Sequence, residues 1–161
     1  MTYTETNFSR CQLTWLVVLR VAIGWHFLYE GIAKLINPSW SSLAYLVDSA
    51  GFMSGIFNAM AGNEGVVKVV DFCNEWGLVL IGLGLILGIF TNLSAYAGMA
   101  LLALYYLSHP PFLGVEFAFP TEGSYLIVDK NLVEIFALGV LVAFPTGRII
   151  GLDRFFVKRT Q

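Results

Sequence analysis

Four long apolar segments dominate the pattern of hydrophobic and polar positions along the chain. Polar, proline-containing or glycine-containing stretches separate them, and they lie at about residues 13–36, 66–90, 93–108 and 129–144. An α-helix needs roughly 20 apolar residues to cross the hydrocarbon core of a bilayer. The first two segments reach this length, the third has a minimal turn before it, and the fourth is somewhat short. The pattern predicts four transmembrane helices, with the second and third as antiparallel neighbours.

The connectors between these segments differ in character. Residues 37–65 contain apolar side chains at helical spacing but are interrupted by glycine, which predicts short helices at the membrane interface. Residues 109–128 hold three of the five prolines and show no periodicity, which is typical of a functional or flexible connector. The tail, residues 147–161, alternates bulky apolar and basic residues and predicts an amphipathic helix lying on a membrane surface.

Composition supports a membrane protein. Hydrophobic residues make up 57% of the chain and charged residues only 12%, whereas soluble domains carry about 25% charged residues. The net charge of −2 gives no reason to expect nucleic acid as a partner. We therefore expect an all-α fold, a single integral membrane domain over residues 1–161 built as a four-transmembrane-helix bundle with short interfacial helices. Its main partner is the lipid bilayer, and a homo-oligomer is compatible with the sequence.

The distribution of basic residues predicts the topology. Arg10 precedes the first segment, and four basic residues follow the last one: Arg148, Arg154, Lys158 and Arg159. The positive-inside rule then places both termini in the cytoplasm and both long connectors outside, in the periplasm of a bacterium. Arg20 interrupts the first apolar segment and no clean cleavage site follows, so we expect this segment to be retained. The predicted location is the bacterial inner membrane, with several spans.

The first predicted helix carries an unusual number of polar residues for a membrane span. A charge at the centre of a span costs roughly 2.5–3.5 kcal/mol on insertion scales, so such residues usually face a cavity or a partner. His26, Glu30 and Lys34 are spaced four apart and share one helix face, where Glu30 is able to pair with either neighbour. Arg20 and Gly24 belong to a second stripe. We expect Arg20 to snorkel inward or to bond a carboxylate or a ligand anion.

The predicted topology gathers polar residues from all four helices at the outer side of the membrane. This arrangement predicts an outward-opening polar pocket between the helices. Its candidate members are Glu30, Lys34, Asp71, Glu75, His109, Asp129, Asn131 and Glu134.

Simpler interpretations compete with a functional one for each of these residues. The acids are as well explained by structural pairing with Lys or Arg, and Asp71 by a solvated helix start. For His26 a hydrogen-bonded core position is favoured over a ligand-binding role, and for His109 a helix end before two prolines. Anchoring at the membrane interface is the default role of tryptophan.

The chain lacks the spacing of a haem or zinc site, and its two cysteines form no CxxC motif. Cys11 and Cys73 are predicted at opposite membrane faces, roughly 30 Å apart, too far to form a disulfide within one chain. We therefore expect no metal and no internal dithiol.

Three stretches together resemble a known family: RVAIGWHFLYEGIAKL in the first segment, EWGLVLIGLGLILGIFTNLSAYAGMALL across the second and third, and DKNLVE with PTGRIIGLDRFF near the end. This pattern is similar to the DoxX family of small four-helix membrane proteins. The connector HPPF…TEGSYLIVDKNLVE is similar to its DoxD-like branch. Positions that match recurrent family residues are Arg20, Gly24, Gly31, Lys34, Glu75, Gly84, Asp129 and Asn131.

The resemblance implies a membrane redox subunit. DoxD-type members are associated with thiosulfate:quinone oxidoreductase, and other relatives with oxidative-stress assemblies. In this reading Glu30, Glu75 and Glu134 are the catalytic proton carriers. Lys34, Arg20, His109 and Asn131 bind an anionic substrate, and Trp25 and Trp76 hold a membrane quinone. A soluble or membrane redox partner would supply further chemistry. The alternatives are a non-catalytic anchor or assembly subunit of a redox complex and, third, a small-solute carrier.

Overall fold

A computed structural model describes residues 8–111, 117 and 126–156 of the chain. All elements in these residues are helical, which confirms the predicted all-α fold. Four are long: α1 (Arg10–Leu35), α4 (Glu64–Leu87), α5 (Thr91–Ser108) and α6 (Lys130–Ala143). The short ones are α2 (Leu43–Val47), α3 (Ser54–Ala61), the 3₁₀ turn η1 (Thr146–Arg148) and α7 (Asp153–Phe156).

The long helices begin and end close to the predicted positions, and local capping explains the differences. Helix α1 begins three residues early because Ser9 and Gln12 form a capping box, in which each side chain accepts a hydrogen bond from the other's backbone. Gly88 ends α4 in the left-handed conformation, with φ of 65°, which glycine adopts at little cost. Asp129 caps α6 by accepting a hydrogen bond from the backbone of Leu132.

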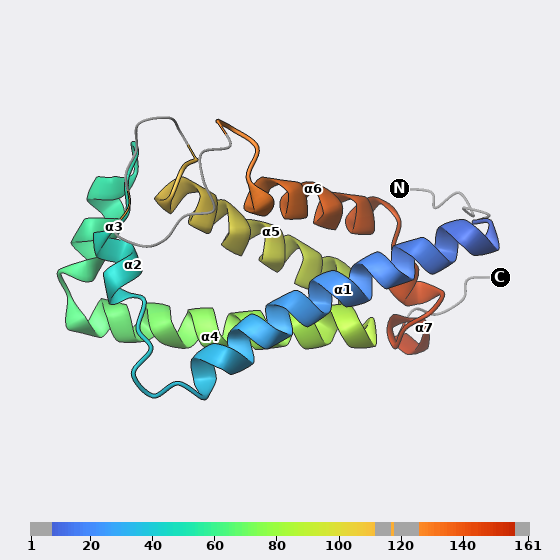
Figure 1. The fold of residues 1–161 in the computed structure, drawn as a ribbon. Coiled ribbons are helices and arrows are strands. Elements are labelled where there is room, and N and C mark those ends of the chain that lie inside the picture. Colours follow the sequence, from blue (N-terminus) through green and yellow to red (C-terminus); the bar gives the residue numbers. More distant parts are fainter. Residues whose placement is uncertain (1–7, 112–116, 118–125, 157–161) are drawn as a thin grey trace.

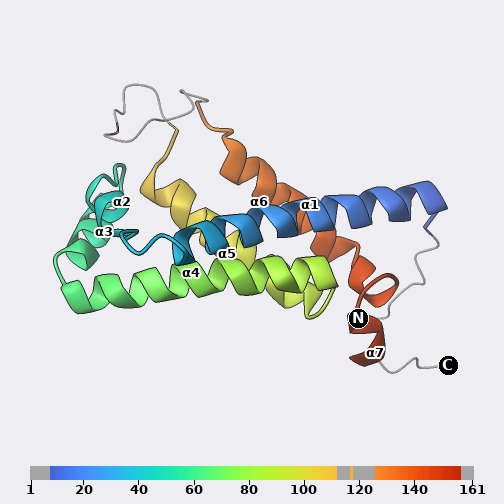
Figure 2. The same cartoon turned by 60° about the horizontal axis from the view of Figure 1, so that its bottom comes forward.

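The four long helices form two pairs that diverge toward one end of the molecule (Figure 1). Helix α1 packs along α4 and α5 packs along α6, whereas α1 and α6 have few contacts. Helices α2 and α3 lie at the end where the pairs diverge. The start of α1 lies with α7 at the other end, and a view turned by 60° shows the same arrangement (Figure 2).

Three glycines allow α1 and α4 to approach each other closely. A Cβ atom on Gly82 of α4 would lie 2.5 Å from the backbone nitrogen of Leu28 in α1. In α1, a Cβ on Gly24 or Gly31 would lie within 3 Å of α4 side chains. The second stripe predicted on α1, which includes Gly24, therefore lies in a helix interface.

The core lies where the four helices meet, and it contains leucines from three of them: Leu78, Leu85, Leu102, Leu138 and Leu141. Many large apolar side chains face outward instead, among them Trp15, Leu80 and Phe136, which are 69%, 63% and 65% exposed. Such an outer surface suits contact with lipid better than contact with water. Within the described residues α1 and α4 are long and apolar enough, by length and composition, to cross a membrane.

The first part of the C-terminal tail is hydrogen-bonded to the helix bundle through Asp153. The carboxylate of Asp153 accepts hydrogen bonds from the backbone nitrogens of Phe90, at 2.7 Å, and Thr91, at 3.0 Å. It thereby satisfies two of the free N–H groups at the start of α5. The predicted surface helix over residues 147–161 thus begins as a packed turn, and residues 157–161 lie outside the described residues.

Candidate functional site: a polar cavity between two helix pairs

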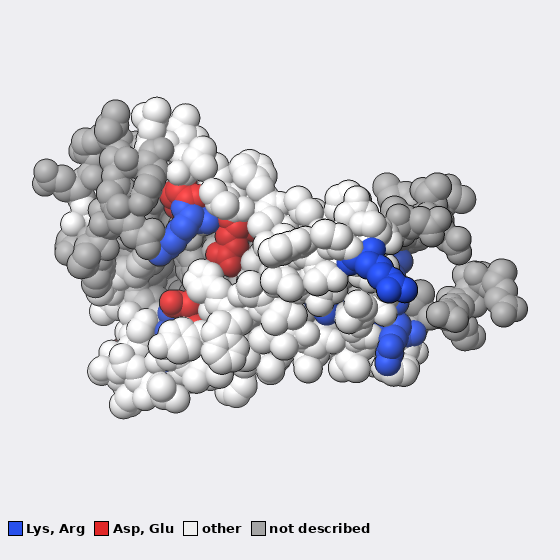
Figure 3. All heavy atoms as spheres, turned by 45° about the vertical axis from the view of Figure 1, so that its right-hand side comes forward, with Lys and Arg blue, Asp and Glu red and all other residues white. Residues whose placement is uncertain are grey.

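A cavity of about 530 Å³ occupies the space between the two helix pairs. All four long helices contribute to its walls, residues 37–45 cover its outer end, and Phe27, Leu78 and Leu102 are apolar residues in its lining. Acidic and basic side chains gather around a hollow on this face of the molecule (Figure 3). The predicted polar pocket is therefore present between the helices.

Lys34 is a cation in the lining of the cavity. Its Nζ donates a hydrogen bond of 2.9 Å to Oδ1 of Asn74 and lies 5.1 Å from the ring centre of Trp40 and 5.6 Å from that of Tyr105. An ammonium group over aromatic rings is stabilised by cation–π attraction while it keeps N–H groups for other acceptors. Lys34 is thus held in place and still able to bind an oxygen atom of a ligand.

A second donor lies beside Lys34. Since the oxygen of Asn74 faces the ammonium group, its amide Nδ2 is directed to the hydroxyl of Tyr105, to which it donates at 2.6 Å. The Tyr105 oxygen therefore acts as an acceptor, and its own hydrogen is available for a partner in the cavity. Lys34 and Tyr105 together present two donors from two different helices.

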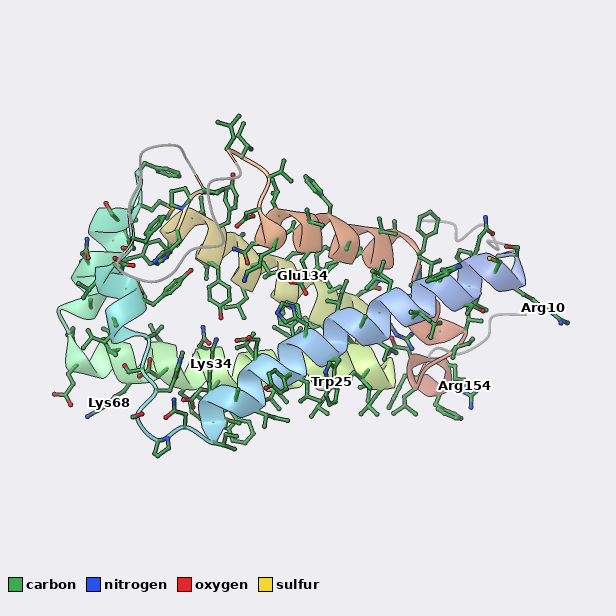
Figure 4. All side chains as sticks on the ribbon, viewed as in Figure 1. Arg10, Trp25, Lys34, Lys68, Glu134 and Arg154 are labelled. Atoms are coloured by element: carbon green, nitrogen blue, oxygen red, sulfur yellow. The ribbon has the colours of Figure 1, made fainter. Side chains whose placement is uncertain are left out.

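A histidine–carboxylate pair also lines the cavity, farther along α1 from Lys34. His26 Nδ1 lies 3.0 Å from Oε1 of Glu134, which joins α1 to α6. Figure 4 shows Lys34 and Glu134 directed from α1 and α6 toward the space between the helix pairs. Glu30 also lines the cavity, one helical turn from both His26 and Lys34, yet among the described residues it forms an ion pair with neither. These groups are able to exchange protons with a ligand.

Asp71 of α4 forms hydrogen bonds with residues 37–45, the segment that covers the cavity. Its carboxylate accepts a hydrogen bond of 2.9 Å from the Ser41 hydroxyl and one of 2.7 Å from the Ser42 backbone nitrogen. The expectation that Asp71 is only a solvated helix start is therefore wrong. The acid holds the segment that carries Trp40 above Lys34.

Four other predicted site residues lie apart from the cavity lining. Arg20 is buried at the far end of the bundle, 2% exposed, and donates hydrogen bonds to Thr146 Oγ1 at 3.1 Å and to the Ile150 carbonyl at 2.7 Å. Glu75 follows Asn74 on α4 outside the lining, and the side chains of Trp25 and Trp76 face outward, 63% and 44% exposed.

His109 belongs to a separate cluster at the outer end of α5. Its ring stacks on Tyr45 with 3.9 Å between centres, and its Nε2 lies 3.6 Å from the Asp48 carboxylate. Burial lowers the pKa of His109, and the nearby Asp48 partly opposes this effect. Asn131, in contrast, does line the cavity, and its amide donates to Asp129 at 2.8 Å.

Sequence reasoning missed Asn74, Tyr105 and Trp40 as members of the site. Asn74 offered a signal, because it shares a helical stripe with the core residues Leu78 and Ile81. A polar residue on a buried stripe needs a hydrogen-bond partner inside the bundle. Tyr105 and Trp40 offered none, since aromatic residues are common at membrane interfaces.

The described residues contain no group of three or more His, Cys, Asp or Glu side chains placed to bind a metal ion. Cys11 and Cys73 are both free and exposed, as expected from their predicted separation.

Comparison with known proteins supports the resemblance noted in the sequence. The family model DoxX matches residues 15–110, which extend from α1 to just beyond α5 and include Lys34, Asn74 and Tyr105. No curated protein and no solved structure matches the chain. Since the match covers more than half of the chain, the protein is a membrane protein of the DoxX family.

Proposed function

We propose that the protein is a quinone-linked redox subunit of the bacterial inner membrane and that the cavity is its substrate site. The observation that carries this proposal is the pairing of two kinds of group around one cavity. Lys34 and Tyr105 provide hydrogen-bond donors, and His26 with Glu134 provides proton-exchanging groups. Quinone reduction requires both kinds of group.

The chemistry assigns a role to each of these side chains. A quinone that takes up two electrons also takes up two protons, and two thiosulfate ions that lose one electron each join as tetrathionate. Lys34 and Tyr105 would donate hydrogen bonds to a quinone carbonyl or a thiosulfate oxygen and stabilise the negative charge that develops there. Glu134, through His26, and Glu30 would deliver protons to it.

We infer that all four long helices cross the membrane with both termini in the cytoplasm. Helices α5 and α6 have 18 and 14 residues, so they extend about 27 and 21 Å and are short for a 30 Å core. Arg10 and Arg154 lie at the end of the bundle away from Lys68 and from the cavity (Figure 4). The positive-inside rule supports an inner location for that end, with the cavity in the outer half.

The test is quinone binding and thiosulfate-dependent quinone reduction by the purified full-length protein in lipid nanodiscs. We expect Lys34→Met and Glu134→Gln to lose turnover, because they remove a donor and a proton carrier. Lys68→Met is the matched control, since Lys68 is exposed and pairs only with Glu64 on the same helix among the described residues.

Absence of both quinone binding and turnover in wild-type protein would reject this function. If such an inactive protein were isolated from native membranes with a redox enzyme bound to it, the assembly-subunit function would take its place.

A further inference from the structure

With the topology proposed above, the pair formed by His26 and Glu134 lies close to the middle of the membrane. His26 is nine residues from the outer end of α1 at Leu35, which corresponds to about 14 Å along the helix. Half of the hydrocarbon core measures about 15 Å. The pair bridges two helices that otherwise have few contacts with each other.

This polar pair is also open to the side. The side chain of His26 is 51% exposed although Glu134 is only 12% exposed. Large exposed side chains precede or follow the pair on the same helices: Trp25 and Tyr29 on α1 and Val133 on α6. A polar pair that faces hydrocarbon is costly unless it borders a cavity, and both residues do line the cavity. The pair therefore lies at the edge of the cavity where α1 meets α6.

The other boundaries of the cavity are closed more firmly. Toward the cytoplasm, Phe27 and Leu138 are 3% and 0% exposed, and both pack against Gly98, where a Cβ atom would lie 3.2 and 3.0 Å from them. Toward the outside, two hydrogen bonds to Asp71 hold the covering segment. Between α1 and α6, in contrast, the helices have few contacts with each other.

We propose that the cavity receives its ligand sideways from the bilayer, through the opening between α1 and α6 that the His26–Glu134 pair bridges. The ligand is then a lipid-soluble molecule with an oxygen-bearing head group and a hydrocarbon tail. Its head group passes the pair to reach Lys34 and Tyr105, while its tail remains between the exposed side chains of α1 and α6. This inference rests on the proposed ligand site and adds the route and the placement of the tail.

The experiment uses the full-length protein in lipid nanodiscs and a ubiquinone analogue with a photoreactive diazirine on the first isoprene unit of its tail. Binding of the head group is measured separately, from the quenching of tryptophan fluorescence by a tail-free quinone. The quenching in wild-type protein is compared with that in Trp40→Phe, which removes the tryptophan of the cavity lining. After illumination, mass spectrometry locates the labelled residues. We expect labels on Tyr29 and Val133, and their loss when excess unlabelled ubiquinone competes.

A bound head group with the label on residues 39–45 would overturn lateral entry and leave the proposed function standing. Labels spread evenly over outward residues such as Leu80 and Phe136, and not reduced by competitor, would also overturn it, because they report the tail in bulk lipid. No binding of the tail-free quinone and no competed label would reject the ligand site itself. The matched variant Val133→Trp, at the opening, should reduce the competed label several-fold, whereas Val69→Trp, equally exposed on α4, should not.

Discussion

Lys34 Nζ on α1 donates a hydrogen bond of 2.9 Å to Oδ1 of Asn74 on α4, and this bond orients the Asn74 amide toward Tyr105. One buried amide thus positions a cation and a phenol that come from different helices. Asn74→Leu keeps a similar side-chain volume but removes both hydrogen bonds. We expect quinone affinity to fall about tenfold or more, since a hydrogen bond that involves a charged group contributes about 1.5–3 kcal/mol. Equilibrium binding in nanodiscs measures the effect.

Asn58→Leu is the control for that substitution, because Asn58 lies exposed on α3 away from the cavity lining. Unchanged affinity in Asn74→Leu would show that Lys34 and Tyr105 do not depend on the amide for their placement.

The glycines of α4 give a second prediction with an internal control. Gly82→Ala places a methyl group 2.5 Å from the Leu28 backbone and must separate α1 from α4, so it should lower the stability of the protein by about 1–3 kcal/mol. Gly77→Ala meets no atom within 4 Å and should be neutral or slightly stabilising. Thermal unfolding of the two variants in the same detergent compares them. Equal effects would contradict the close approach of α1 and α4.

Arg20 should matter for stability and leave the cavity intact. Arg20→Met removes the donors to Thr146 and to the Ile150 carbonyl, and we expect a loss of about 2–4 kcal/mol with little change in ligand affinity of the folded fraction. Arg20→Lys retains the charge but lacks the forked donor, so it should recover only part of the loss. Arg10→Met, on the exposed start of α1, is the control. Lost affinity at full stability would instead return Arg20 to the predicted anion-binding role.

The His109 cluster predicts a pH dependence of stability. Burial lowers the pKa of His109 below its ordinary value of 6.5, so between these two values the unfolded chain binds more protons than the folded chain. The stability associated with neutral His109 is complete above pH 6.5 and decreases as the pH falls through this window. His109→Gln should flatten the change of melting temperature between about pH 7.5 and pH 5. An unchanged slope would mean that other groups control it.

The sequence pattern predicted the helices well because the spacing of apolar residues and the residues that end a helix are local properties of the sequence. It also predicted that Glu30, Lys34, Glu134 and Asn131 gather in one pocket, since topology alone brings those helix ends together. It did not predict that Glu134 pairs with His26 in place of a Lys or Arg. That choice depends on the rotation of α1 against α6, which close packing at Gly24 and Gly82 determines. The spacing of apolar residues along one helix does not reveal how that helix packs against another.

Because the sequence pattern does not reveal how helices pack, it also placed Arg20 and Trp25 in the pocket, whereas both lie outside the cavity lining. Arg20 was expected near an anion because its partners, Thr146 and the Ile150 carbonyl, lie about 130 residues later and carry no charge. Trp25 immediately precedes His26, yet a 100° step along the helix turns it outward. Whether a side chain one position away from a polar face enters a cavity depends on the neighbouring helix.

The hydrogen bonds between Arg20 and residues 146–150 have a consequence for the biogenesis of the protein. Arg20 enters the membrane with the first helix, but its partners are synthesised only after α6. Until then the guanidinium group bears the cost of a charge in an apolar environment. The same late segment carries Asp153, which caps the start of α5. Completion of this end of the bundle therefore waits until residues 146–153 have been synthesised. A nascent chain that stops short of Thr146 would present quality-control proteases with an unpartnered arginine inside the bilayer.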